Sequence, residues 1–331
     1  GYAAVPGTDA LRDRIAARVA ARTGVATTRD NVVVTAGGQA GLFAAHVAAC
    51  GPGEAALYVD PYYATYPGTI RAASSVAVPV ETRAEDGFLP DPAAVDAAAR
   101  DSGARSLLIN TPNNPTGVVY PRATLAGLAE VARARDLWVI SDEVYDAQVW
   151  EGAHLSPRAI PGMAARTLVI GSMSKSHAMT GSRLGWIVGP PEAVDALIDL
   201  STNTTYGTPG YIQDAAAFAL DRGESPEAAV AAPFRRRRDA VLRRLAGQDA
   251  VGVIPSQGAM YLMLDIRGTG LSGRDFAERL LDDEGIAVMP GESFGRSAAG
   301  HVRVALTVDD DRLLDAVGRL CAFAAGLARA A

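Results

Sequence analysis

A single lysine marks the place where amine chemistry is expected in this sequence. Lys175 is the only lysine among 31 basic residues, and all the others are arginines. Arginine replaces lysine as a surface cation, but it cannot replace an amine that must lose its proton to react. Lys175 follows the apolar run 168–172, which predicts a buried strand, and open α/β sheets bind ligands at the carboxyl ends of their strands. The position therefore predicts a nucleophilic amine at a ligand site.

The residues around Lys175 favour the binding of a phosphate. Ser172 and Ser174 supply two hydroxyl groups, and Arg183 follows the lysine in the run Gly-Ser-Arg-Leu-Gly-Trp. Hydroxyl groups and a forked guanidinium are suitable ligands for phosphate oxygens. A phosphate site beside a nucleophilic amine suits a phosphorylated aldehyde held as an imine, which indicates pyridoxal phosphate.

A glycine-rich turn supplies a second element that favours an anion. Gly37, Gly38 and Gln39 follow the apolar run 31–35 and precede a predicted helix. Backbone N–H groups at a helix N-terminus bind anions, and glycine lets the backbone wrap around them. A tight turn from strand to helix needs glycines too, so the turn is informative only beside the other motifs.

Two side chains after the run 138–141 suit the ring of such a cofactor. A carboxylate at Asp142 can keep a pyridine nitrogen protonated, so that the ring withdraws electrons from the α-carbon of a substrate. The alternative for Asp142 alone is a helix N-cap. Tyr145 follows three residues later, where its phenol can hydrogen-bond a ring oxygen and shift the pKa of the imine.

Two further strand ends carry candidate ligands. Asn114 lies in the loop 110–117, whose two prolines fix the turn and hold the amide in place, although an ordinary rigid loop is the alternative. Tyr63 follows the apolar run 56–59, and an aromatic ring there can stack on a flat ligand.

An arginine in an otherwise apolar strand indicates an anionic partner. In the run 301–306, Val302 and Val304 fall on one face and Arg303 on the other. A buried guanidinium requires a negative group, which is either a substrate carboxylate held by both arms of the fork or a structural salt bridge.

The elements that position these residues predict an α/β fold. Buried strands are predicted at 31–35, 56–59, 106–110, 138–141, 168–172 and 185–188, with helices at 41–50, 93–101 and 122–136. Beyond about residue 205, helices are predicted at 211–245, 273–284 and 310–328, and strands at 260–266, 286–289 and 301–306. This second pattern predicts a smaller α/β domain, and the arginine run 235–238 is interpreted as a solvated helix face.

Composition excludes several classes of protein. The chain has 331 residues and a net charge of −6, with 49% hydrophobic residues, which excludes a disordered chain and argues against a nucleic-acid partner. No apolar run approaches the length of a membrane span, so no membrane association is expected. Two cysteines and no visible signal peptide favour the cytoplasm.

Taken together, the motifs resemble those of class I aminotransferases of the pyridoxal-phosphate fold type I family. The resemblance covers nearly the whole chain and is carried by 110–117, 141–145, 172–175, 181–186 and Arg303, in the family's order. It implies a three-layer large domain on a mostly parallel seven-stranded sheet and a smaller C-terminal α/β domain. The implied division is a remnant of an N-terminal segment at 1–23, which packs with the small domain or a partner subunit, a cofactor domain at 24–210 and the small domain at 211–331.

The resemblance also assigns roles to single residues. Lys175 is similar to the Schiff-base lysine, Asp142 to the partner of the pyridine nitrogen, Tyr145 and Asn114 to ligands of the ring oxygen, Tyr63 to the stacking residue and Arg303 to the clamp for the α-carboxylate. Ser172, Ser174, Arg183 and Gly37–Gln39 resemble the phosphate site. Tyr2 resembles a tyrosine that reaches the phosphate of the neighbouring subunit, which implies a homodimer with shared active sites. No metal site is implied.

The implied activity is ping-pong transfer of an amino group from an L-amino acid to a 2-oxo acid such as pyruvate or 2-oxoglutarate. The runs 174–181 and 296–301 are most similar to arginine–pyruvate aminotransferases. Other pyridoxal-phosphate reactions remain open, namely a C–S lyase, an oxidase or cyclase, or a decarboxylase, and so does a sensor domain of a transcription regulator. Family members usually carry several dozen residues before the position of Tyr2, and these residues help to select the substrate.

Overall fold

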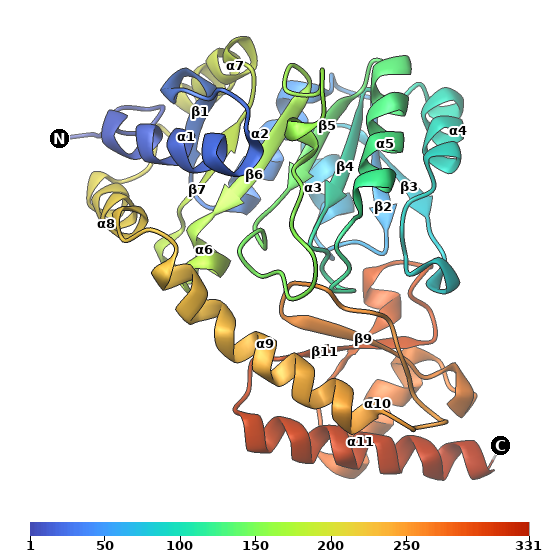
Figure 1. Ribbon diagram of the computed structural model, residues 1–331. Helices are drawn as coiled ribbons and strands as arrows, with labels where there is room; N and C mark the ends of the chain where they lie inside the picture. Colours follow the sequence, from blue (N-terminus) through green and yellow to red (C-terminus); the bar gives the residue numbers. More distant parts are fainter. Residues whose placement is uncertain (331) are drawn as a thin grey trace.

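The chain folds into a large three-layer α/β unit and a smaller C-terminal α/β unit (Figure 1). The computed structural model describes residues 1–330. A seven-stranded sheet with the order β1-β7-β6-β5-β4-β2-β3 forms the centre of the large unit. Its strands are β1 (Val32–Thr35), β2 (Ala55–Asp60), β3 (Val76–Glu81), β4 (Ser106–Asn110), β5 (Trp138–Asp142), β6 (Thr167–Ser172) and β7 (Gly185–Val188). Only β7 runs antiparallel to its neighbours, so the predicted mostly parallel sheet is confirmed.

The apolar runs predicted six of these strands and missed β3. This strand lies at the edge of the sheet beside β2, and most of its side chains are exposed or half-buried. It also carries Pro79, which an edge strand tolerates because one of its sides makes no ladder hydrogen bonds. An edge strand therefore lacks the continuous apolar run by which buried parallel strands are recognised.

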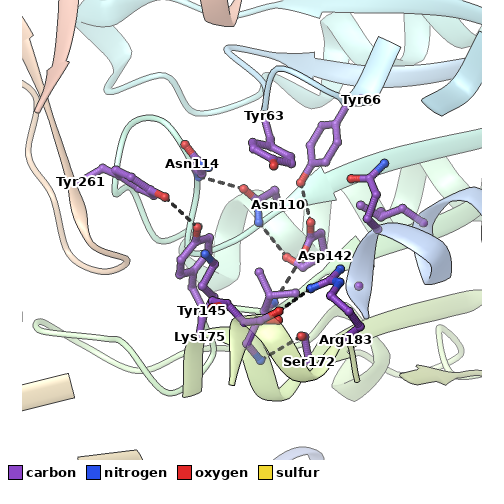
Figure 2. A pocket seen from close by; sticks show the side chains of 16 residues that line it. Tyr63, Tyr66, Asn110, Asn114, Asp142, Tyr145, Ser172, Lys175, Arg183 and Tyr261 are labelled. Atoms are coloured by element: carbon purple, nitrogen blue, oxygen red, sulfur yellow. Dashed lines mark hydrogen bonds between the residues drawn. The ribbon is translucent and has the colours of Figure 1, made fainter. Parts of the chain in front are cut away.

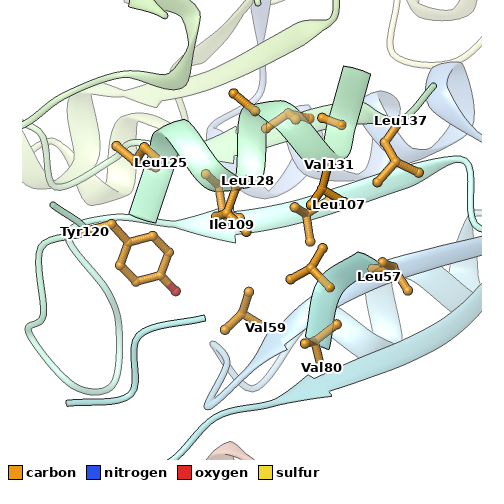
Figure 3. Close-up of a cluster of buried hydrophobic side chains, with 14 of the residues drawn as sticks. Leu57, Val59, Val80, Leu107, Ile109, Tyr120, Leu125, Leu128, Val131 and Leu137 are labelled. Carbon is orange, nitrogen blue, oxygen red and sulfur yellow. The ribbon is translucent and has the colours of Figure 1, made fainter. Parts of the chain in front are cut away.

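Helices cover both faces of the large sheet. One face is covered by α2 (Gly38–Ala49), α3 (Tyr66–Ala72) and α7 (Pro191–Thr202), and the other by α1 (Asp9–Thr23), α4 (Pro92–Ser102), α5 (Arg122–Ala134) and α8 (Gly210–Asp221). In α5, Leu125 and Leu128 lie one helical turn apart and belong to the same core cluster as Ile109 of β4 (Figure 3). Burial of each such leucine contributes about 1.5–3 kcal/mol to folding.

The C-terminal unit is a four-stranded antiparallel sheet packed against three helices. The sheet has the order β10-β11-β9-β8, with β8 (Gly252–Val253), β9 (Tyr261–Asp265), β10 (Met289–Pro290) and β11 (His301–Ala305). The helices are α9 (Ser225–Leu245), α10 (Gly273–Glu284) and α11 (Asp310–Ala330). Val302 and Val304 of β11 point into this core, so the predicted alternation around Arg303 is confirmed.

Three details of the predicted elements differ from the structure. The helical region 211–245 is two helices, because α8 ends at Asp221 and Gly223 adopts a positive φ of 66° before α9 begins. In place of the strand predicted at 286–289, the structure has only the two-residue strand β10. The arginine run is not wholly solvated, since Arg238 is buried and donates to the carbonyl of Ser256 and to Glu151, and charge alone gives no sign of such a fixed partner.

The N-terminal helix is part of the large unit's packing. Leu11, Ile15 and Val19 of α1 lie in one core cluster with Trp186 of β7 and Ala216 of α8. Thr8 is the N-cap of this helix, and its hydroxyl accepts a hydrogen bond from the Leu11 N–H, while Gly24 is the C-cap in the left-handed conformation.

Candidate active site

The carboxyl ends of β4, β5 and β6 meet the turn after β1 around a cavity of about 220 Å³ (Figure 2). Most of the residues proposed from the sequence line it, namely Gly38, Gln39, Tyr63, Asn114, Asp142, Tyr145, Ser172, Ser174, Lys175 and Arg183. They come from five separate segments of the chain, which the parallel sheet brings to one edge.

Lys175 enters the cavity from the short helix α6 (Met173–Ser176), which continues directly from β6. Ser172 is the N-cap of this helix, and its hydroxyl accepts a hydrogen bond from the Ser174 N–H at 3.0 Å. The carbonyl of Lys175 accepts a hydrogen bond from the Gln148 side chain at 3.1 Å. Within residues 1–330 the Lys175 amine forms no salt bridge, so it is available to a ligand in the cavity.

Asp142 is a buried carboxylate held by two hydrogen bonds. It is only 4% exposed and accepts from the Tyr66 hydroxyl at 2.7 Å and from the Val144 N–H at 3.2 Å. Burial raises its pKa to about 6, although both hydrogen bonds and the Lys175 charge favour the ionised form. The residues that follow Asp142 form a turn, so the alternative of a helix N-cap is wrong. A buried anion with spare lone pairs is suited to pair with a cationic ligand group.

The backbone of Asn114 is fixed by its neighbours in the loop after β4. The backbone N–H of Asn114 donates to Asn110 Oδ1 at 2.8 Å, while Asn110 Nδ2 donates to the carbonyl of Asp142 at 2.9 Å. Asn110 thus links the loop to the end of β5, and Figure 2 shows both bonds. Asn110 is only 2% exposed, and its two buried hydrogen bonds account for the predicted rigidity of this loop.

Arg303 reaches the same region from the C-terminal sheet. Its Nη1 donates to Asn114 Oδ1 at 2.8 Å, and its guanidinium lies between the rings of Tyr261 and Phe294, 4.3 and 4.5 Å from their centroids. No carboxylate among the described residues forms a salt bridge with it, and its Nε has no partner there. Burial lowers the pKa of Arg303, the direction expected of a cation that lacks an anion. The alternative of a structural salt bridge is therefore wrong within the described chain.

The opposite end of the cavity has the features of an anion site. Gly37 has a φ of +84°, and a Cβ there would lie 2.5 Å from Nη2 of Arg183. Arg183 is itself fixed by a 2.8 Å bond from Nη1 to the carbonyl of Thr180. The N-terminus of α2 begins beside it at Gly38, so free backbone N–H groups and a guanidinium converge on one spot.

The remaining proposed residues, Gln39 and Tyr63, line the same cavity. Gln39 hydrogen-bonds Thr69 at 2.7 Å and accepts from Thr65 at 3.0 Å, which ties α2 to the segment that carries Tyr63. Tyr63 lines the cavity and lies edge-on to the Tyr66 ring, with 5.7 Å between the centroids.

Tyr2 is not among the residues around the cavity of its own chain. It is 90% exposed and lies edge-on to Tyr206, with 5.2 Å between the ring centroids. Within one chain the structure therefore brings together all the proposed residues except this one.

Three residues of the site were missed by the sequence analysis. Tyr66 and Asn110 support Asp142, and Tyr261 joins Tyr145 to Arg303. Asn110 ends a predicted strand beside the proline loop, and that position was an available signal. Tyr66 and Tyr261 gave no comparable signal, because each acts through a side chain far away in the sequence.

No helix in residues 1–330 is long and apolar enough to cross a membrane. No group of three or more His, Cys, Asp or Glu side chains in that range is placed to hold a metal ion.

Comparison with known proteins assigns the chain to a family. The family model described as aminotransferase class I and II matches residues 1–320. An arginine–pyruvate transaminase from Pseudomonas aeruginosa is 44% identical over 98% of this chain and 83% of its own length. An aspartate/prephenate aminotransferase from Thermus thermophilus is 37% identical over 99% of this chain and 84% of its own.

Solved structures show the same fold. An aromatic aminotransferase from Pyrococcus horikoshii superposes with a TM-score of 0.93 at 30% identity, covering 98% of this chain and 87% of that one. An aspartate aminotransferase from Thermus thermophilus, solved with maleate, superposes with a TM-score of 0.90 at 34% identity, covering 97% and 84%.

Proposed function

The chain belongs to the class I and II aminotransferases, and from this premise we propose that it uses pyridoxal 5′-phosphate to move an amino group from an L-amino acid to a 2-oxo acid. The observation that carries the proposal is the convergence of an amine, a buried carboxylate and an anion site on one cavity. Lys175 and Asp142 line the same cavity as Gly38 and Arg183, which form the anion site with Gly37. The three groups match an aldehyde, a pyridine nitrogen and a phosphate.

Residues of this chain are suited to bind both the phosphate and the ring of this cofactor. Arg183, Ser172 and the N-terminus of α2 would hold the phosphate, with Ser174 and Gln39 beside them, while Asn114 and Tyr145 would bind the ring oxygen. Gly37 supports the fit, because a Cβ at that position would close the site against Arg183. When bound, the cofactor supplies an aldehyde that reacts with amines and a ring that withdraws electrons from the α-carbon.

The proton chemistry falls to Lys175 and Asp142. Once released by an incoming amino acid, the Lys175 amine takes the α-proton and later returns it one carbon away, and a positioned base of this kind contributes about 10²–10⁴ in rate. Asp142 holds a proton on the ring nitrogen, which its burial and its bond from Tyr66 allow. Arg303 would hold the α-carboxylate through the N–H groups that Asn114 does not take, and Tyr63, which lines the cavity, would cover the face of the ring.

The test is a half-reaction followed by absorbance. Purified protein loaded with cofactor is mixed with single L-amino acids in the absence of an oxo acid. L-Arginine and then pyruvate come first, because a 44% identical relative is an arginine–pyruvate transaminase. We expect the visible band of the lysine-bound cofactor to disappear with the right donor and to return with pyruvate or 2-oxoglutarate.

Replacement of the lysine is the control for this experiment. Lys175→Ala is expected to lose turnover by up to about 10⁴-fold, because the chain has no other lysine to take over the proton transfer. Full turnover in that variant would refute the assignment. A wild-type band that no amino acid converts would instead favour another reaction at the same site, and release of ammonia and pyruvate from a thioether would identify a lyase.

The same proposal includes a homodimer with shared active sites in a reducing cytoplasm. Its support is a set of exposed aromatic residues at the N-terminus and in or just before α8, namely Tyr2, Tyr206, Tyr211 and Phe218, which are 53–90% exposed. Such residues favour contact with a second subunit, where Tyr2 would reach the partner's phosphate. Cys50 and Cys321 are unpaired in the described chain, which suits a reducing compartment. Sedimentation equilibrium tests the dimer, and a monomer would refute it.

A further inference from the structure

Tyr261 connects the two ends of the candidate site. It is the first residue of β9 in the C-terminal unit, and it lines the cavity with only 8% of its surface exposed. Its hydroxyl lies 3.2 Å from the hydroxyl of Tyr145, and its ring lies 4.3 Å from the guanidinium carbon of Arg303. One side chain therefore contacts both the proposed ligand of the ring oxygen and the proposed ligand of the substrate carboxylate.

The backbone of Tyr261 is fixed from two sides. On β11, Ala305 pairs with it in register, two residues beyond Arg303. Its carbonyl accepts a hydrogen bond from Ser256 Oγ at 3.1 Å, and a Cβ on Gly117 would lie 2.8 Å from the same carbonyl oxygen. The loop that carries Asn114 therefore packs directly on Tyr261, and the position of its ring is determined by both domains.

Arg303 depends on this ring for its orientation. Phe294 lies 4.5 Å from the guanidinium carbon, which Tyr261 contacts at 4.3 Å, and Asn114 takes one arm of the fork. A planar cation between two rings keeps its plane, and its remaining N–H groups stay directed to a bound carboxylate. The aromatic pair replaces the carboxylate partner that a buried arginine usually has.

The hydroxyl contact determines where the Tyr145 proton points. A phenol has one proton to donate, so one member of the Tyr145–Tyr261 pair donates to the other. If Tyr261 donates, the Tyr145 proton is free to point into the cavity, toward a ring oxygen. The Arg303 guanidinium carbon lies 4.3 Å from the centroid of the Tyr261 ring, so a change in its charge alters the electrostatic field at this hydroxyl pair.

We propose that Tyr261 is a positioning residue which couples the Arg303 carboxylate site to the Tyr145 hydroxyl. The inference rests on the proposed function, and it extends it to a residue outside the set predicted from the sequence. A carboxylate that binds Arg303 neutralises the cation above the Tyr261 ring and thereby changes the field at the hydroxyl contact between Tyr261 and Tyr145. Binding of the substrate carboxylate is thereby transmitted to the oxygen that contacts the cofactor ring.

Two variants separate the ring from the hydroxyl. Tyr261→Phe keeps the ring against Arg303 and removes the bond to Tyr145, whereas Tyr261→Leu removes both. Tyr58→Phe is the matched control, because Tyr58 is 6% exposed and lies in the core of the large unit outside the cavity. All are prepared as full chains loaded with pyridoxal phosphate, and their thermal midpoints are recorded to show that they fold.

The first readout is a pH titration of the visible absorbance, with and without propionate as a carboxylate that cannot be transaminated. In the wild type, propionate is expected to shift the apparent pKa at which the visible absorbance of the bound cofactor changes. In Tyr261→Phe this shift is expected to be smaller by about half a pH unit or more. The second readout is the Kd for propionate. It is expected to stay within about twofold in Tyr261→Phe and to rise about tenfold in Tyr261→Leu, where the cation loses one ring.

The outcomes decide the proposal separately from the proposed function. If Tyr261→Phe titrates like the wild type and Tyr261→Leu binds propionate equally well, Tyr261 is a packing residue and the proposal is refuted. If Tyr261→Leu does not fold, the titration of Tyr261→Phe against Tyr58→Phe still decides the role of the hydroxyl. Failure of the proposed function would appear as a wild-type protein that no amino acid converts, whatever the variants do.

Discussion

Asp142 shows how the burial of a single residue sets a condition on cofactor binding. The carboxylate is removed from water, and only the Tyr66 hydroxyl, the Val144 N–H and the more distant Lys175 charge favour its ionised form. Burial dominates and raises its pKa to about 6. The anion that a protonated pyridine nitrogen needs is therefore present above that pH and is lost below it.

We predict that the apoprotein's affinity for pyridoxal phosphate falls as the pH drops from 7 to 5. Protonation of Asp142 removes one charge from the site, so the slope approaches about tenfold per pH unit below 6. Fluorescence titration of the apoprotein measures the Kd at each pH. Asp142→Asn is the control, because it keeps the shape and removes the titration.

The comparison of the two proteins isolates Asp142 from the cofactor's own ionisations, which both share. The variant is expected to bind about tenfold or more weakly at pH 7.5, where the wild type has its charge. The gap is expected to close toward pH 5. Parallel profiles for the two proteins would contradict the role assigned to Asp142.

At the scale of elements, the turn from β1 into α2 depends on one glycine. Gly37 has a φ of +84° and lies against Arg183, with space for a hydrogen but not for a methyl group. Gly53 has a similar φ of +80°, but no atom lies within 4 Å of the Cβ it would carry. Alanine variants at these two positions therefore distinguish the effect of a side chain at positive φ, which both have, from the effect of filling the anion site, which only Gly37→Ala has.

We predict that Gly37→Ala weakens pyridoxal phosphate binding about tenfold or more, because the added methyl group displaces the Arg183 guanidinium. The affinity for pyridoxal, which lacks the phosphate, is expected to change little. Gly53→Ala also places an alanine at a positive φ, at a cost of about 1 kcal/mol, and is expected to bind both compounds as the wild type does. Equal losses for the two compounds in Gly37→Ala would place the defect elsewhere in the cavity.

The elements also show what the sequence can and cannot predict. The strands that end in Asn110, Asp142 and Ser172 are buried on both faces, so their apolar runs locate both the strands and the residues that follow them. Site contacts between distant segments have no such signal. Tyr261 contacts Tyr145 across 116 residues, and only the packing of one domain on the other brings them together.

At the scale of the whole molecule, the C-terminal unit is attached to the large sheet near the end of β2. The carboxylate of Asp60 accepts the N–H groups of Arg296 and Ser297 at 2.9 and 3.3 Å, and the Tyr62 N–H donates to the carbonyl of Phe294 at 2.9 Å. This contact holds the segment that carries the Phe294 ring against Arg303. The geometry of the carboxylate site therefore depends on how the two units dock.

The docking contact contains a buried carboxyl group whose pKa is raised. Burial and the nearby Glu81 raise the pKa of Asp60 to about 6 from an ordinary 3.8, against the two backbone hydrogen bonds. The folded protein thus binds this proton more tightly than the unfolded chain does. The stabilisation is fully present below about pH 4 and is lost as the pH rises through 6, by about 3 kcal/mol in total.

We predict that Asp60→Asn removes this part of the pH dependence, because an amide carries no charge and does not titrate in this range. Its single oxygen accepts one of the two N–H groups that the carboxylate accepts through its two oxygens. Relative to the variant, the wild-type apoprotein is expected to lose stability between pH 4 and pH 7, which thermal midpoints measured across that range would show. Asp86→Asn, at an acid whose side chain is 66% exposed, is expected to leave the wild-type profile unchanged.

The Asp60 contact positions the segment that carries Phe294, so the Kd for propionate should stay constant in Asp60→Asn if docking is kept. A variant whose midpoint parallels that of the wild type at every pH would show that the Asp60 carboxyl stays ionised throughout, and that the domain contact carries no linked proton.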